Sequence, residues 1–166
     1  MSNILKVDDK MSYVELEGTT RGIWRYPDGS IADEKVTKNN ILLQIRQPIV
    51  RLLGGLMTDP NTLPFISAIG FGSDNTPPAI TDTDLVTPVN NSRRLLATAP
   101  TFSTDGLQAT FCVLFDLVDN DVDGVPLKEE CLYTRDGVAV ARTVIGSYTK
   151  VPGMYFEFYH TIGYNS

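Results

Sequence analysis

Apolar and polar residues alternate along much of the chain, and this alternation predicts β-strands. In the longest stretch, 108–118, Ala109, Phe111, Val113 and Phe115 share one face of a period-two pattern. Similar alternation, or a short apolar run between turn residues, predicts strands over 7–17, 22–26, 31–36, 65–71, 95–99, 131–133, 138–144 and 154–164. Residues typical of turns and breaks separate these segments at 18–22, 27–30 and 134–137.

One segment has helical periodicity instead. Its apolar residues recur every three or four positions, at Ile41, Ile45, Ile49, Leu52 and Leu56. We expect a helix that begins after a cap at Thr37 or Asn39 and ends at Gly54–Gly55. Pro48 predicts a kink within it, or two short helices.

These elements predict a mainly β protein, an antiparallel β-sandwich-like domain with one α-helix in its N-terminal half packed against it. The 166 residues are enough for a single domain, 1–166, with a hydrophobic core of its own. Within this domain, residues 1–38 are expected to form an N-terminal arm or a hairpin extension. In the last strand, Phe156, Phe158 and His160 share one face, and Tyr155 and Tyr159 lie on the other.

Composition narrows the classes of function. The chain is 42% hydrophobic and 20% charged, as folded globular proteins are, and its net charge of −6 argues against a nucleic-acid partner. No apolar run approaches the roughly 18 residues of a membrane span, and the N-terminus lacks a signal sequence, so we expect folding in a cytosol without a membrane partner. Cys112 and Cys131 are then expected as free thiols, opposite each other if their strands form a hairpin centred between Asp121 and Val122.

The sequence offers little for catalysis. His160 is the only histidine, and both cysteines lie on apolar strands, so no pair of nucleophile and base is evident. Gly70-Phe71-Gly72 lacks the third glycine, the lysine and the helix of a phosphate loop. The acidic pairs Asp82/Asp84 and Glu129/Glu130 are interpreted as solvated or loop-capping. We therefore predict a protein that is not an enzyme and has no catalytic residues and no cofactor.

The strongest match to a chemical motif is the segment from Asp119 to Glu130. It satisfies the calcium-loop pattern, with carboxylates at Asp119, Asp121 and Asp123 and a glutamate at the twelfth position, Glu130. Both flanking segments are predicted strands, whereas that motif needs helices. An exposed acidic turn is therefore the favoured interpretation, no metal ligand is assigned, and a calcium site in a β context stays as an alternative.

Two segments carry a resemblance to a known group of proteins. The first has Gly70 and Gly72, then Pro78-Ala79, Thr81-Asp82-Thr83 and Leu85; the second has Glu129, Leu132 and Tyr133 and a hairpin ending in Ala141-Arg142. Together with the preceding helical segment, 40–55, they resemble small structural proteins of tailed-bacteriophage virions. The resemblance covers about residue 40 to the C-terminus and leaves 1–38 unaccounted for. It departs from the group's pattern at Phe71 and at Cys131, where glycine is usual.

The resemblance implies a non-enzymatic virion protein, assembled in the host cytoplasm. It would form a homo-oligomer on the tail, collar, baseplate or fibre-attachment region, in contact with portal, tail, fibre or capsid proteins. A capsid decoration protein is the first alternative, and a calcium-stabilised receptor- or glycan-binding tip is the second. The candidate contact surfaces are the loop from Gly70 to Leu85 and the face that bears Tyr155 and Tyr159.

Overall fold

The computed structural model describes residues 16–41, 66–79, 81–104 and 107–164. This part of the chain is mainly β, with a single 3-10 turn at Asn120–Val122. The strands are β1 (Leu16–Arg25), β2 (Ile31–Ile41), β3 (Ile66–Gly72), β4 (Arg94–Leu95), β5 (Thr101–Phe102), β6 (Gln108–Phe115), β7 (Pro126–Thr134), β8 (Ala139–Thr149) and β9 (Tyr155–Tyr164). No helix in the described residues is long and apolar enough to span a bilayer.

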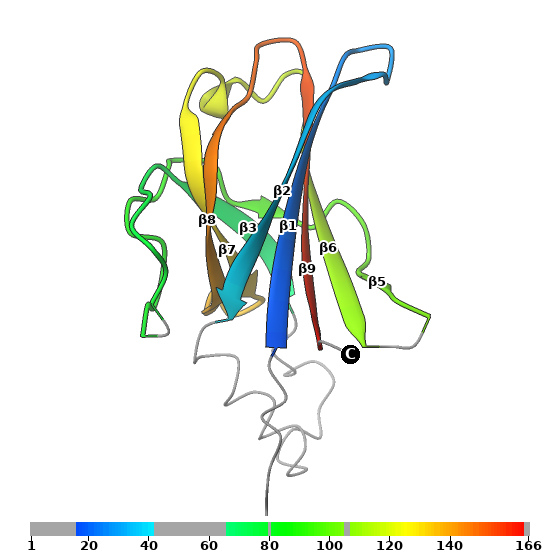
Figure 1. Ribbon diagram of the computed structural model, residues 1–166. Coiled ribbons are helices and arrows are strands. Elements are labelled where there is room, and N and C mark those ends of the chain that lie inside the picture. The colour runs from blue at the N-terminus through cyan, green and yellow to red at the C-terminus, as the bar shows by residue number, and fades with distance from the viewer. Residues whose placement is uncertain (1–15, 42–65, 80, 105–106, 165–166) are drawn as a thin grey trace, which may run out of the picture.

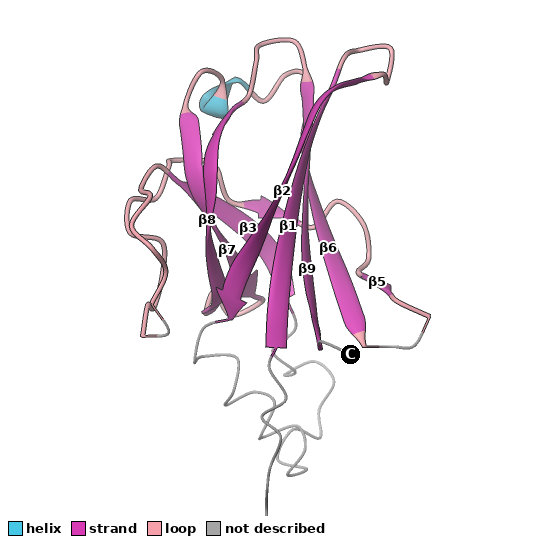
Figure 2. Cartoon of the chain, viewed as in Figure 1, coloured by secondary structure: helices cyan, strands magenta, loops and turns pink. Residues whose placement is uncertain are grey.

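The strands form two antiparallel layers (Figures 1 and 2). They follow one hydrogen-bonded order, β4-β3-β7-β8-β2-β1-β9-β6-β5, in which β8 and β2 join the layers through only two residue pairs, Asn40–Arg142 and Ile41–Ala141. On the other side, the Ala97 amide donates to the Cys112 carbonyl of β6 at 2.8 Å, beside the β3–β4 pairing. The mainly antiparallel, two-layered architecture predicted from the sequence is thus present.

The core lies between the layers and is rich in aromatic side chains. The Trp24 ring stacks on those of Tyr148 and Phe156, each with ring centroids 4.8 Å apart. Phe71 of β3 meets Phe158 of β9 edge to face at 4.9 Å, which ties one layer to the other. Phe158 and Phe156 are fully buried, which confirms the face predicted for the last strand.

The N-terminal hairpin occupies the middle of the strand order. β1 and β2 pair along their length, as expected for residues 22–36, and β1 also pairs with β9. The break predicted at Gly18–Gly22 is wrong, because β1 continues through it. At Gly22 a Cβ atom would lie 2.7 Å from the Tyr148 ring, so this glycine permits close packing within the strand.

The predicted start of the helix is also wrong. Thr37 and Asn39, its expected caps, lie within β2, which extends to Ile41. Their register with Thr20 and Gly18 of β1 shows that strand pairing overrides the local capping signal. The remainder of the predicted helix, 42–56, lies outside the described residues.

The hairpin expected to bring the two cysteines together does not form. β6, with Cys112, pairs with β9 and β5, whereas β7, with Cys131, pairs with β3 and β8. The connection through Asn120–Val122 therefore crosses from one layer to the other, and both thiols are free. The predicted hairpin across Thr134–Gly137 is confirmed, with Gly137 at a φ of 84° in the turn between β7 and β8.

Candidate functional site: a surface loop held by buried charges

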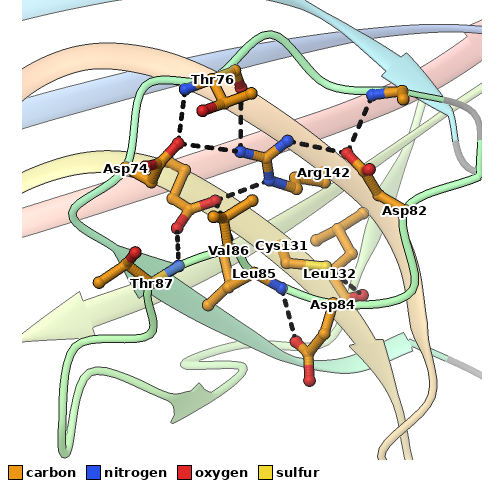
Figure 3. A network of polar contacts seen from close by, with 12 residues as sticks. Asp74, Thr76, Asp82, Asp84, Leu85, Val86, Thr87, Cys131, Leu132 and Arg142 are labelled. Carbon is orange, nitrogen blue, oxygen red and sulfur yellow. Dashed lines mark hydrogen bonds and ion pairs between the residues drawn. The ribbon is translucent and has the colours of Figure 1, made fainter.

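The loop that follows β3 returns against the same strand and lies over the outer side of β7 and β8 (Figure 3). The Ser73 amide donates to the Thr87 carbonyl at 2.9 Å, and the Val89 amide donates to the Phe71 carbonyl at the same distance. These bonds close the base of the loop. Residues 73–79 and 81–87 therefore belong to a surface loop whose two ends are hydrogen-bonded to each other and to β3.

Glu129 of β7 anchors this loop from below. Its side chain is fully buried, and its carboxylate accepts hydrogen bonds from the amides of Thr87 at 2.8 Å and Val86 at 3.1 Å. A Cβ atom at Gly72 would lie 2.1 Å from Oε1 of Glu129. The second glycine of the Gly-Phe-Gly segment thus leaves room for the carboxylate.

Arg142 of β8 completes the anchor. Its buried guanidinium donates from Nε to Glu129 at 2.6 Å, from Nη1 to Asp82 at 2.8 Å and from Nη2 to the Thr76 carbonyl at 3.0 Å. Burial opposes the charge of Arg142, but the bonds to Glu129 and Asp82 outweigh it and raise the pKa of the guanidinium. One arginine therefore ties both arms of the loop to the sheet.

The loop's own carboxylates stabilise its turns. Asp82 accepts a bond from the Ala79 amide at 2.9 Å, and Asp84 accepts one from the Leu85 amide at 2.7 Å. Bonds from Thr76 lower the pKa of Asp74. The loop-capping role predicted for Asp82 and Asp84 is confirmed for both carboxylates, and Asp82 has the additional role of binding Arg142.

A second contact fixes the end of the loop. The Tyr133 hydroxyl of β7 donates to the Asp84 carboxylate, and the Arg93 guanidinium lies over the Tyr133 ring, 4.1 Å from its centroid. Burial raises the pKa of Tyr133. Beneath these polar groups lies a small apolar cluster, Ala68, Leu85, Cys131, Tyr133 and Ala139. The loop is thus packed as well as hydrogen-bonded.

The neighbouring Glu130 points the other way, into the core. Successive residues of a strand face opposite sides, so Glu129 serves the loop and Glu130 meets His160 of the other layer. Their Oε1 and Nδ1 atoms are 2.9 Å apart, and both side chains are fully buried. The loop-capping role predicted for this pair is confirmed for Glu129, which accepts two loop amides. For Glu130 both predicted roles are wrong, because its buried side chain bridges the layers.

The segment that matches the calcium loop has a different geometry. Asp119 accepts a bond from the Asp116 amide at 2.8 Å and pairs with Arg94 at 3.3 Å, while Asp123 binds the Lys150 ammonium at 2.5 Å. Glu130, the twelfth position, lies in the core. The carboxylates therefore do not converge, and the described residues contain no group of three or more acidic, histidine or cysteine side chains placed to hold a metal ion.

The tyrosines predicted on the outer face of β9 are half-buried among charged residues. The Tyr159 hydroxyl donates to Glu157 at 3.1 Å, and Glu157 also pairs with Arg25 of β1 at 3.0 Å. Tyr155 lies opposite Arg25 on the neighbouring strand. This face is on the layer opposite to the anchored loop, so the two predicted contact surfaces are separate.

The arrangement brings together the two segments that carry the resemblance, Gly70 to Leu85 and Glu129 to Arg142, through the contacts of Arg142 with Glu129 and Asp82. In the sequence Arg142 is only the end of a predicted hairpin, between Ala141 and Thr143, and no local pattern indicates that it is buried. No family model, curated protein or solved structure matches the chain.

Proposed function

We propose that the chain is a non-enzymatic structural protein of a tailed-bacteriophage virion, which forms a homo-oligomer on the tail, collar or fibre-attachment region. The proposal rests on the sequence resemblance and on one structural observation. The two segments that carry the resemblance are joined by the buried contact of Arg142 with Glu129 and Asp82. The residues shared with that group thus hold a surface loop in one conformation.

Such an anchor suits a protein whose function is to present a surface. Removing charges from water is unfavourable, and Arg142 and Glu129 are both fully buried. In return, the described loop residues, 73–79 and 81–87, are held in place before any partner arrives, which lowers the entropy cost of binding. We infer that the loop is a preorganised contact surface for a neighbouring virion protein.

The exposed side of the loop is suited to a protein partner. Two of its charged groups, Asp74 and Asp82, are turned toward Arg142 or loop amides, and the third, Asp84, is exposed at the end of the loop. The uncharged residues Asn75, Pro77, Thr81 and Val86 are also exposed, the last at 52%. Uncharged, rigid positions of this kind can be buried without desolvating an ion. We propose portal, tail, fibre or capsid proteins as neighbours and the virion as location, after assembly in the host cytoplasm.

Capsid decoration is the main alternative and differs in stoichiometry. A ring on the tail or collar requires from about six to a few tens of copies per particle, whereas a decoration protein follows the capsid lattice and requires hundreds. The calcium-stabilised tip has less support, because Lys150 neutralises Asp123 and Glu130 lies in the core.

Quantitative mass spectrometry of purified virions of the phage that encodes the chain tests the proposal. The copy number is measured against the major capsid protein. A number in the range of a ring supports a tail or collar position, and a number in the hundreds favours decoration. Absence of the chain from particles would reject the virion assignment.

A further inference from the structure

The register of four strands arranges the outer face of one layer in rows. We define the outer face as the solvent side of β2-β1-β9-β6. One row contains Glu34, Ile23, Glu157 and Leu114, of which Ile23 is only 2% exposed, and the next contains Val36, Arg21, Tyr159 and Cys112. The third row contains Lys38, Thr19, Thr161 and Thr110, and on the other side of the first row Arg25 lies opposite Tyr155.

Charge alternates between the rows. The row of Glu34 and Glu157 is acidic, and it lies between the rows of Arg21 and Arg25. Within the chain these charges are paired, Arg21 with Glu34 at 2.8 Å and Arg25 with Glu157 at 3.0 Å. The two arginines and two glutamates cancel on a chain whose net charge is −6. The outer face is therefore a place where two copies can approach without the repulsion of their overall charge.

The same face offers apolar and aromatic area. Val36 is 61% exposed and Leu114 39%, while Tyr159 is half-buried beside Cys112. Tyrosine and arginine are the residue types enriched at the centre of protein interfaces. A surface with both, and with exposed valine and leucine at either side, has the composition of a contact surface.

We infer that the outer face binds a second copy of this chain in a symmetric, face-to-face dimer. A two-fold axis that crosses the strands between the first and second rows places the acidic row of each copy over the Arg21 row of the other. It also brings Leu114 of one copy near Cys112 of the other. The contact is isologous, so a single patch supplies both partners.

The size of the face meets the requirement of a weak but specific dimer. Four strands at about 4.8 Å spacing and nine residues at about 3.4 Å rise cover roughly 600 Å² on each copy. Two such faces bury about 1,200 Å² in total, at the lower end of specific protein interfaces. We therefore expect a dimer that dissociates on dilution.

Sedimentation velocity over a range of protein concentrations tests the dimer, with Val36→Glu as the disrupting variant. Its matched control is Val118→Glu, since Val118 is 78% exposed and lies in the loop after β6. We expect the wild type and Val118→Glu to dimerise, and Val36→Glu to raise the dissociation constant about a hundredfold or more, because each new carboxylate would be buried opposite Glu34 of the other copy. Arg21→Glu is a second variant and is expected to weaken the dimer by charge repulsion.

The reactivity of the two thiols tests whether the dimer interface lies on the outer face. Cys112 lies within the face, whereas Cys131 is fully buried in the opposite layer. We expect alkylation of Cys112 to slow as the wild type dimerises, and Val36→Glu to abolish that protection. A wild type that stays monomeric, a dimer or larger oligomer unaffected by Val36→Glu, or a dimer in which Cys112 stays equally reactive would each overturn the inference.

This inference rests in part on the homo-oligomer proposed above, but different experimental results would reject the dimer and the virion function. A chain that is absent from virions yet dimerises through this face removes the proposed function and leaves the dimer. A chain present in virions whose association does not respond to Val36→Glu removes the dimer and leaves the function.

Discussion

The guanidinium of Arg142 lies 2.6 Å from the carboxylate of Glu129, and neither side chain is exposed to solvent. Through this pair, β7 and β8 hold a loop that begins more than forty residues earlier in the chain. The carboxylate orders Val86 and Thr87, and the guanidinium orders Thr76 and Asp82. Order in the loop therefore depends on charges beneath it.

Replacing Arg142 by methionine should destabilise the fold strongly. The change leaves Glu129 as a buried carboxylate without its cation, and breaking a buried pair in this way costs about 3–5 kcal/mol. Urea unfolding measures the loss, and hydrogen exchange should show faster exchange at Val86 and Thr87. Arg135→Met, at an exposed turn position, is the control and should cost about 0.5 kcal/mol or less. Equal effects of the two variants would contradict the anchor.

Gly72→Ala should be destabilising for a steric reason. The added methyl would lie 2.1 Å from Glu129 Oε1, so the carboxylate must leave its place and release the loop, at a cost of about 3 kcal/mol. Gly153→Ala is the matched control, because Gly153 has a φ of +75° and open space around it. It should cost only the roughly 1–2 kcal/mol of a left-handed conformation. Thermal and urea unfolding of both variants distinguish crowding from backbone strain.

The contact of Glu130 with His160 should behave as a coupled pair. His160→Phe leaves the Glu130 carboxylate buried without this partner and should cost about 3–5 kcal/mol. Glu130→Leu combined with His160→Phe removes both polar groups, and the double variant should recover most of that loss. A double-mutant cycle by urea unfolding measures the coupling. Additive single effects would show that the two side chains act independently.

Alkaline pH should destabilise the protein through its buried tyrosines. Burial raises the pKa of Tyr148 to about 12, and the pKa of Tyr159 is raised to about 12 as well, against about 10 in an unfolded chain. Stability from these groups is fully present below pH about 10 and declines as the pH rises toward 12, because only the unfolded state then loses the protons. Absorbance at 295 nm follows ionisation, and Tyr148→Phe should reduce the slope of stability with pH. An unchanged slope would argue against Tyr148 as a source.

Calcium should leave thermal stability unchanged. Lys150 occupies the Asp123 carboxylate, and Glu130 faces the core, so the ligand set of a calcium loop is not assembled. We expect the same melting temperature in millimolar calcium and in chelator, both for the wild type and for Asp121→Ala. A rise of several degrees with calcium, abolished by Asp121→Ala, would restore the calcium-stabilised alternative.

The sequence by itself determined most of the long strands, the faces of the last strand and the loop turns. The alternation of Phe156, Phe158 and His160 with the tyrosines of β9 identifies the buried side, because a period of two is a local property of the strand. The Asp-Gly signal before Val138 likewise fixes the hairpin of β7 and β8. Asp82 and Asp84 cap turns within a few residues of themselves, so local chemistry was enough to predict that role.

Only the tertiary structure decided how these elements pair and which charges are buried. The crossing between β6 and β7 separates Cys112 from Cys131, and strand pairing with β1 overrides the helix cap expected at Thr37. Arg142, Glu129 and Asp82 come from three distant parts of the chain. Their contacts depend on the pairing of distant strands, which produces no periodic pattern in the sequence. The local sequence around an arginine on a strand is therefore the same whether its side chain is solvated or binds a buried carboxylate.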